Sequence, residues 1–380
     1  MALPRSDWAS LPINLLDLIL NYLVPMEDYL RFSEVCIEWQ YAVREKLQHL
    51  RSNHKRHCRL HQKVPLLMAP TTDNTRERCC LYDVMTGKSL WEFQLRLGRS
   101  KCEGSSHGWL ILVEDDSYKV TLFNPCSSKL IHLPPLEKPM SFEYSGRIYE
   151  ESFPSSRRRS VLCIDPDVNR DEFVLMMTCD GLIRRVALIK SGEEDWTYIE
   201  GLQDVKDIVY SNGFFYVLDG WGVLFSCDVS KDLKVRRITS PENLCGLVLY
   251  LVESPEGDFL RIVKQKYTGN FVIYKLVWFS KNPRWEEVTS LGDVGLFLGE
   301  NHSTSVIASD FAGCRPNSIY FIKPCRYPND SYANVYVLSL NDRTVTRLYP
   351  RSRSPLLWIS PKFRWSYYSL SLVYVSLSPL

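Results

Sequence analysis

Three short stretches with one shared pattern recur along the chain at a constant spacing. Each begins with a small residue and runs into a strand rich in aromatic side chains: GWLIL at 108–112, GFFYV at 213–217 and SIYFI at 318–322. Further strand-like runs lie near the midpoints, at 160–164 and 258–262. The underlying period is therefore about 50 residues, which predicts that most of the chain is an array of similar β units.

The segment from residue 64 onward consists of short runs of β-branched and aromatic residues, separated by Gly, Asn, Asp and Pro. A unit of about 50 residues fits one four-stranded blade of a kelch-like β-propeller. Because blades bury their faces only against neighbouring blades, the array should close into a ring. We expect a mainly β fold with about six blades over residues 64–362. Residues 363–380 would form a closing strand or an atypical tail.

The first fifty residues follow a helical pattern instead. After the Leu-Pro pair at 11–12, apolar residues at 16, 19, 20 and 23 keep the spacing of one helix face, and further leucines occupy much of the remaining circumference. Two more short helices are expected before residue 50, which makes a small three-helix module. Helices this apolar need burial on more than one side, and so small a module cannot supply it alone. Either the large domain or a partner protein covers the remainder.

The order of residues within this module is distinctive. It contains Trp8, Leu11-Pro12, Leu15-Leu16, Ile19, Leu23, Leu30, Val35-Cys36 and Trp39. This order resembles an F-box, the helical domain that docks a protein onto the Skp-type adaptor of a cullin ubiquitin ligase. The resemblance implies an F-box over residues 1–50. The adaptor-binding residues would be Leu11, Pro12, Leu15, Leu16, Ile19 and Leu23, and the F-box core would include Val35, Cys36 and Trp39.

Three longer phrases in the large domain carry a second resemblance. They are CEGSSHGWLIL, LFNPCSSKLIHLPPL and LFLGENHSTSVIASDFAGCRPNSIYF. They resemble the plant-type propeller-like domain, long labelled as of unknown function, that commonly follows an F-box. The two resemblances together imply a non-catalytic substrate receptor whose partners are the adaptor, a cullin and an unknown target protein. Two alternatives stay open: a propeller enzyme, an esterase or a glycosidase, and a scaffold that binds the adaptor without delivering targets.

Residues 104–108 satisfy the G-x-S-x-G pattern of a hydrolase nucleophile elbow, with Ser106 in the nucleophile position. An elbow requires a strand, a sharp turn and then a helix. Here two strand-like runs follow, which indicates a hairpin, so Ser106 is predicted to lie in a structural turn. A calcium-loop pattern that begins at Asp165 has Arg170 in the position that requires glycine. No catalytic residue, metal site or cofactor is expected.

A strongly basic stretch follows the helical module, with seven Lys and Arg residues against one Glu in residues 44–63. Its second part, 51–63, is predicted to be a basic linker helix. His54, His57, Cys58 and His61 would share one face of that helix, so it could bind a metal, against the alternative of a solvated linker with a weak nuclear-localisation role. A second basic cluster at 157–159 is predicted to lie in a loop.

The overall charge is nearly balanced. Lys and Arg number 46 against 44 Asp and Glu, so the net charge is +2, and no overall field favours a nucleic-acid or membrane partner. The amino-terminal residues have no signal-peptide pattern, and the 12 cysteines are scattered, which is typical of reduced thiols. These features predict a cytoplasmic or nuclear protein.

Overall fold

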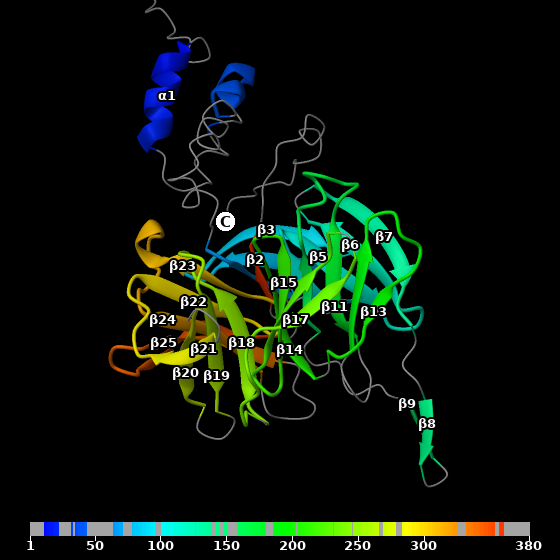
Figure 1. Ribbon diagram of the computed structural model, residues 1–380. Helices are drawn as coiled ribbons and strands as arrows, with labels where there is room; N and C mark the ends of the chain where they lie inside the picture. Colours follow the sequence, from blue (N-terminus) through cyan, green and yellow to red (C-terminus); the bar gives the residue numbers. More distant parts are fainter. Residues whose placement is uncertain are drawn as a thin grey trace, which may run out of the picture. The chain divides into compact units, whose positions relative to one another are not determined.

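The chain divides into two units, residues Met1–Gln62 and Lys63–Leu380, and each is considered by itself. The computed structural model in Figure 1 describes residues 11–22, 32, 35–43, 64–70, 78–95, 100–125, 127–137, 141–144, 147–150, 158–179, 185–202, 204–230, 232–244, 246–265, 269–278, 283–324, 332–353 and 357–360. The predicted linker helix and the tail from residue 361 lie outside these ranges.

The first unit is helical, as its sequence pattern predicts. Helix α1 (Ile13–Tyr22) begins directly after Pro12, whose carbonyl accepts hydrogen bonds from the backbone N–H groups of Leu15 at 2.9 Å and Leu16 at 3.2 Å. Residues 37–43 form a second helix. The predicted count of three helices is not confirmed, because the segment between these two lies mostly outside the described residues. The apolar core of the unit comprises Leu16, Leu20, Phe32, Ala42 and Val43.

The second unit is a six-bladed β-propeller (Figure 1). Blade 1 contains β27 (Leu357–Ile359), β1 (Leu66–Pro70), β2 (Arg78–Asp83) and β3 (Lys88–Gln94). Blade 2 contains β4 (Ser100–Ser106), β5 (Trp109–Glu114), β6 (Lys119–Asn124) and β7 (Lys129–Pro135). Blade 3 contains β10 (Ser160–Leu162), β11 (Val174–Cys179), β12 (Arg185–Lys190) and β13 (Thr197–Ile199).

The remaining blades follow in chain order. Blade 4 contains β14 (Val205–Ser211), β15 (Phe214–Asp219), β16 (Leu224–Asp228) and β17 (Lys234–Arg237). Blade 5 contains β18 (Val248–Glu253), β19 (Phe259–Lys264), β20 (Phe271–Val277) and β21 (Arg284–Val288). Blade 6 contains β23 (Ser303–Ile307), β22 (Val294–Leu298), β24 (Ser318–Pro324), β25 (Tyr332–Ser339) and β26 (Val345–Arg353). A separate hairpin pairs β8 (Ser141–Tyr144) with β9 (Arg147–Glu150).

Burial within a blade falls from the inner strands to the outer one. The middle strand β11 is buried at all six positions, whereas the outer strand β17 is exposed at all four. The middle strands are apolar on both faces because a neighbouring blade covers each face. Each of the six junctions between adjacent blades accordingly contains its own cluster of buried apolar side chains. The core of the propeller is therefore a ring of six inter-blade layers.

The ring is closed by a strand from the carboxyl-terminal part of the chain. Strand β27 pairs antiparallel with β1, with Leu357 opposite Met68. Trp358 in this strand is fully buried, and its Nε1 donates a hydrogen bond to the carbonyl of Leu298 in blade 6 at 3.1 Å. Closure thus involves residues 357–359. The segment 363–380, predicted as a closing strand or an atypical tail, lies outside the described residues.

Blade 6 departs from a regular four-stranded blade. Strands β22 and β24 run parallel, and β23 folds back from β22 to become the innermost strand. The 3-10 helix η2 (Ala308–Asp310) lies on the connection back to β24. The long phrase from residue 296 to 321 therefore encodes an inserted inner strand. The six-bladed ring agrees with the sequence prediction, whereas a kelch-like character is not confirmed.

Candidate functional site

Helix α1 places apolar side chains on two faces. Leu16 and Leu20 are one turn apart and buried in the helical core, while Leu11 and Ile19 are partly buried beside them. Pro12 and Leu15 of the predicted adaptor set are exposed. Leu23, the last member of that set, lies outside the described residues. The helix therefore packs through one face and leaves another free.

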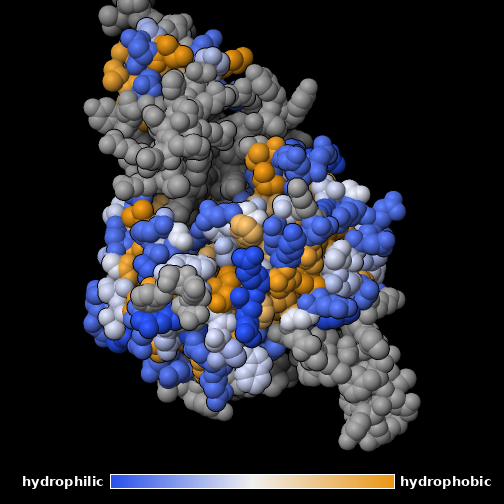
Figure 2. Space-filling view, viewed as in Figure 1, coloured by the Kyte–Doolittle hydropathy of each residue, from blue (hydrophilic) through white to orange (hydrophobic). Residues whose placement is uncertain are grey.

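More apolar residues of this unit are exposed than the resemblance implied. Ile13, Leu15 and Leu18 on α1 are exposed, and so are Ile37 and Tyr41 on the second helix. Figure 2 shows hydrophobic residues at the surface of this unit beside hydrophilic ones. The signal for Ile13 and Leu18 is present in the sequence, because the apolar residues of this helix extend around most of its circumference. A surface of this composition is typical of a protein-docking site.

The predicted F-box core residues lie near the second helix. The Trp39 ring packs against the ring of Phe32, with 4.2 Å between centroids, and Trp39 joins the apolar cluster of the unit. Cys36 is partly buried, and its carbonyl accepts the backbone hydrogen bond from Gln40 at 3.0 Å. Val35 is exposed. Of the three residues, Trp39 therefore contributes most to the described packing.

The G-x-S-x-G segment comprises the end of β4 and the two-residue turn into the antiparallel strand β5. Ser106 Oγ accepts a hydrogen bond from the backbone N–H of Leu162 at 3.1 Å, and a ring nitrogen of His107 lies 3.1 Å from the carbonyl oxygen of the same residue. His107 adopts a φ of 53° and Gly108 one of 83°, as a tight turn requires. This segment ties blade 2 to blade 3, and a strand, not a helix, follows the turn. The geometry is that of a structural turn.

Polar side chains from several blades meet at the inner strands. Arg159, directly before β10, is buried, and its Nε lies 3.3 Å from Asp207 Oδ1 while its Nη1 donates to the carbonyl of Gly299 at 2.8 Å. Burial raises the pKa of Asp207, and the Arg159 charge acts against that shift. Burial, together with the charges of Arg159 and His107, lowers the pKa of His302 to about 4. Through Asp207 and Gly299, Arg159 links blades 3, 4 and 6.

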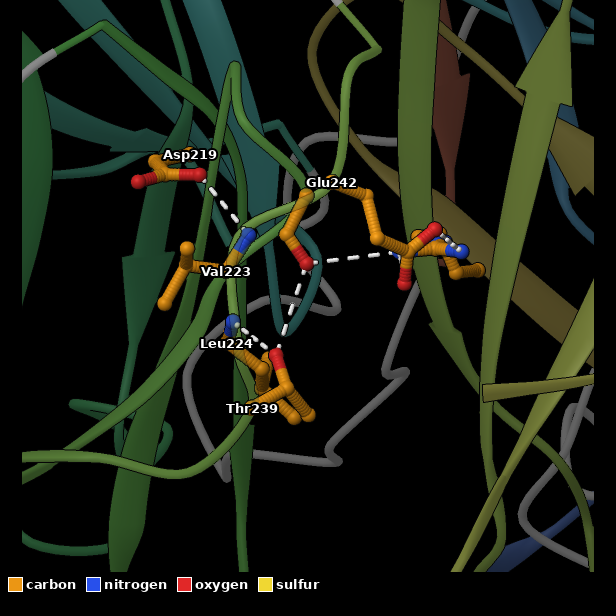
Figure 3. Close-up of polar contacts among 7 residues, drawn as sticks. Asp219, Val223, Leu224, Thr239 and Glu242 are labelled. Atoms are coloured by element: carbon orange, nitrogen blue, oxygen red, sulfur yellow. Dashed lines mark hydrogen bonds and ion pairs between the residues drawn. The ribbon is translucent and has the colours of Figure 1, made fainter. Parts of the chain in front are cut away.

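A second polar network lies between blades 4 and 5 (Figure 3). Asp219 ends β15, and its Oδ1 accepts hydrogen bonds from the backbone N–H groups of Trp221 at 2.9 Å and Val223 at 2.8 Å. Thr239 Oγ1 accepts from the N–H of Leu224 at 2.9 Å. Burial is the main cause that raises the pKa of the Asp219 carboxyl. We call residues 219–223 the Trp221 turn.

The Trp221 turn is anchored from blade 5 by a fully buried cation. Arg261 on β19 forms a two-pronged pair with Glu242, with distances of 3.0 Å to Oε1 and 2.8 Å to Oε2. Its guanidinium carbon lies 4.7 Å from the ring centroid of Tyr274 and 4.8 Å from that of Trp285. The Glu242 backbone N–H in turn donates to the carbonyl of Trp221 at 2.7 Å. The sequence did not predict this network, because its members are up to 42 residues apart and match no motif.

The described residues offer little for other chemistry. Among them, no group of three or more His, Cys, Asp or Glu side chains is arranged to hold a metal ion. The predicted metal-binding face at His54, His57, Cys58 and His61 lies outside the described ranges. Within those ranges, no helix combines the length and the hydropathy needed to cross a bilayer.

Comparison with known proteins identifies both units. Residues 48–345 match the KIB1-4 beta-propeller family, and residues 8–50 match the F-box domain. Probable F-box protein At4g22165 of Arabidopsis thaliana is 27% identical over 342 residues, which cover 86% of each chain. F-box protein SKIP23 of the same organism is 28% identical over 360 residues, which cover 83% of this chain and 84% of the relative. Among solved structures, TolB from Acinetobacter baumannii is 11% identical, covers 78% of this chain and 66% of its own, and has a TM-score of 0.42.

Proposed function

The chain belongs to the KIB1-4 beta-propeller family and begins with an F-box domain, and from this premise we propose that it is the substrate-receptor subunit of a Skp-cullin-F-box ubiquitin ligase. The F-box would bind the Skp-type adaptor, which in turn binds the cullin. The propeller would bind the target protein. The combination of an F-box with a propeller favours a binding role for this chain over an enzymatic one.

The observation that carries this proposal is the free apolar face of the helical unit. Leu15 and Leu18 stand one turn apart on α1 with their side chains exposed. Apolar side chains held at helical spacing bind a groove on a partner because they are desolvated together. We propose that Pro12, Leu15 and Leu18 contact the adaptor. Leu16 is 1% exposed, and we assign it, with Leu11 and Ile19, to support of this face from the helical core.

The receptor would act through proximity. The ligase gains rate when a target lysine is held near a ubiquitin carrier, because an encounter between two molecules becomes a reaction within one complex. No nucleophile in this chain is needed for that role. The Ser106 hydroxyl accepts a hydrogen bond from the backbone of blade 3, and Arg159 is paired with Asp207. Both groups therefore have structural partners, which supports a non-catalytic role.

Two other functions predict different behaviour. An esterase or a glycosidase on the propeller would turn over generic ester or glycoside substrates. A scaffold would bind the adaptor but leave the lifetime of its partners unchanged. Of the three functions, we favour the receptor role, in which the F-box binds the adaptor and the propeller binds a target for ubiquitination.

The adaptor interface is testable by binding measurements with purified full-length protein and a Skp-type adaptor. We expect Leu15→Ala/Leu18→Ala to weaken binding at least about tenfold, since truncation of central apolar contacts typically costs 1–2 kcal/mol each. Leu11→Ala/Pro12→Ala should also reduce adaptor recovery. Isothermal calorimetry would provide the affinities.

A matched control comes from the propeller. Leu130 on β7 is 44% exposed, close to the 42% of Leu15, and Leu130→Ala should leave adaptor affinity unchanged. Equal adaptor binding by the wild type and both helical variants would exclude this face as the adaptor site.

A further inference from the structure

The Trp221 turn presents a large aromatic side chain to solvent. Trp221 is 55% exposed, although it lies between Gly220 and Gly222 at a blade junction whose neighbouring side chains are mostly buried. Indole rings contribute strongly to protein interfaces because they bury a large area and carry a polar N–H. An exposed tryptophan therefore contributes most to binding where its backbone is held in one conformation.

The backbone of this turn is held on both sides. Gly222 has a φ of +73°, and a Cβ there would lie 2.8 Å from Arg261 Nη1 and 2.7 Å from Leu244 Cδ1. A Cβ on Gly220 would lie 2.1 Å from Asp204 Oδ2. The positive φ makes glycine the favoured residue at 222, a Cβ at 220 would displace the Asp204 side chain, and Asp219 receives two backbone hydrogen bonds from the same turn. A turn fixed in this way loses little conformational entropy when Trp221 binds a partner.

The charges around the turn are arranged asymmetrically. In the pair with Arg261, Glu242 is 42% exposed and Arg261 is 0% exposed. In the pair with Lys206, Asp204 is 53% exposed and Lys206 is 26% exposed. In each pair the carboxylate faces solvent more than its cation does. Asp204 and Glu242, which we call the acidic rim, are thus the more exposed members of two ion pairs beside the turn.

We propose that Trp221 and the acidic rim form a binding site for a lysine- or arginine-bearing segment of a target protein. A cation over the face of an indole is attracted by the ring, and nearby carboxylates add ionic hydrogen bonds. The outer strand β17 of the same blade is basic and exposed, so the proposed site is confined to the turn. The inference rests on the proposed receptor role for the identity of the occupant, since a receptor requires a site that binds targets.

The test uses the full-length protein and a fluorescent synthetic peptide of alternating lysine and glycine, with a glutamate–glycine peptide of equal length as its counterpart. Fluorescence anisotropy at low ionic strength should show binding of the lysine peptide that weakens as salt is added. Trp221→Ala should weaken it about tenfold, the effect of losing one desolvated cation–π contact. Asp204→Asn should weaken it severalfold and leaves the Arg261 pair intact.

Trp278→Ala is the matched control, because Trp278 is also exposed but follows β20 in blade 5. It should bind the lysine peptide like the wild type. Thermal unfolding of Trp221→Ala should match that of the wild type, since its indole is largely solvated. Equal losses in Trp221→Ala and Trp278→Ala, equal binding of the glutamate peptide, or no binding of the lysine peptide would each overturn the inference.

Adaptor affinity of the same preparations separates this inference from the proposed function. Adaptor binding without peptide binding would contradict the proposed Trp221 site but not the receptor role. Peptide binding without adaptor binding would leave the site and remove the ligase role.

Discussion

Arg261 is a fully buried cation whose charge is balanced by one partly exposed carboxylate. Its guanidinium contacts Glu242, the carbonyl of Gly222 at 3.4 Å, and two aromatic rings. Removing a charge from water is costly unless partners replace its hydration. Glu242 supplies most of that replacement, so the pair determines whether the blade 4–5 junction keeps its geometry.

Replacement of Glu242 should therefore affect stability despite its exposure. We expect Glu242→Gln to lower the free energy of unfolding by about 1–3 kcal/mol, because the buried guanidinium loses its counter-charge. Glu287→Gln, at an exposed position on β21, should change it by less than about 0.5 kcal/mol. Urea denaturation of both variants provides the comparison. Equal stability of the two would show that the rings alone can hold the guanidinium.

Single residues differed in how well the sequence predicted them. Ser106 is predictable as part of a turn because the strands after it follow directly in the chain. The basic cluster at 157–159 was expected in a loop, and Arg159 does precede the inner strand β10, but its side chain is buried. Its counter-charge, Asp207, lies 48 residues further along. A run of charged residues normally indicates a solvent-exposed segment. Only the tertiary fold brings the carboxylate of Asp207 to Arg159.

At the level of single elements, the short strand β27 closes the propeller ring. It has three residues, all buried, and it joins the end of the propeller to its first blade. Trp358 packs edge-on against Phe297, with 5.2 Å between ring centroids. Asn301 Nδ2 donates to Ser105 Oγ at 3.1 Å, and Ser105 Oγ donates to the Trp358 carbonyl at 2.7 Å. Blades 1, 2 and 6 are thus joined at this strand.

Trp358→Ala should destabilise the propeller by about 3–5 kcal/mol, the usual cost of emptying a buried aromatic site. The exposed Trp278→Ala should cost less than about 0.5 kcal/mol. Differential scanning calorimetry of the two variants measures the contrast. A Trp358→Ala protein as stable as the wild type would mean that ring closure depends on other contacts.

The repeat in the sequence locates elements of blades 2, 4 and 6 correctly, since β5, β15 and β24 begin within one residue of the three repeated stretches. The midpoint stretches are not equivalent to one another, because 160–164 falls on the inner strand β10 and 258–262 on the second strand β19. The inserted strand β23 could not be predicted. Periodicity reports the strands that blades share, whereas an insertion is specified by contacts that occur in one blade only.

For the whole molecule, the separation into two units has a functional consequence. The propeller has an apolar layer at every blade junction and so has a core of its own. The helical unit has its own small core. Loss of adaptor binding should therefore leave target binding by the propeller intact.

The two-unit organisation permits an experiment in the native cell that distinguishes a receptor from a scaffold. Deletion of residues 1–50 should leave the proteins bound to the propeller unchanged but lengthen the lifetime of a true target severalfold, because the target is held without a ubiquitin carrier nearby. The full-length Leu11→Ala/Pro12→Ala variant should act in the same way, which controls for the deletion itself. Quantitative mass spectrometry of captured proteins, followed by a chase after protein synthesis is blocked, measures both quantities. If the captured proteins decay at one rate with all three forms, the chain is a scaffold; if their decay slows only when the F-box is lost or altered, they are its targets.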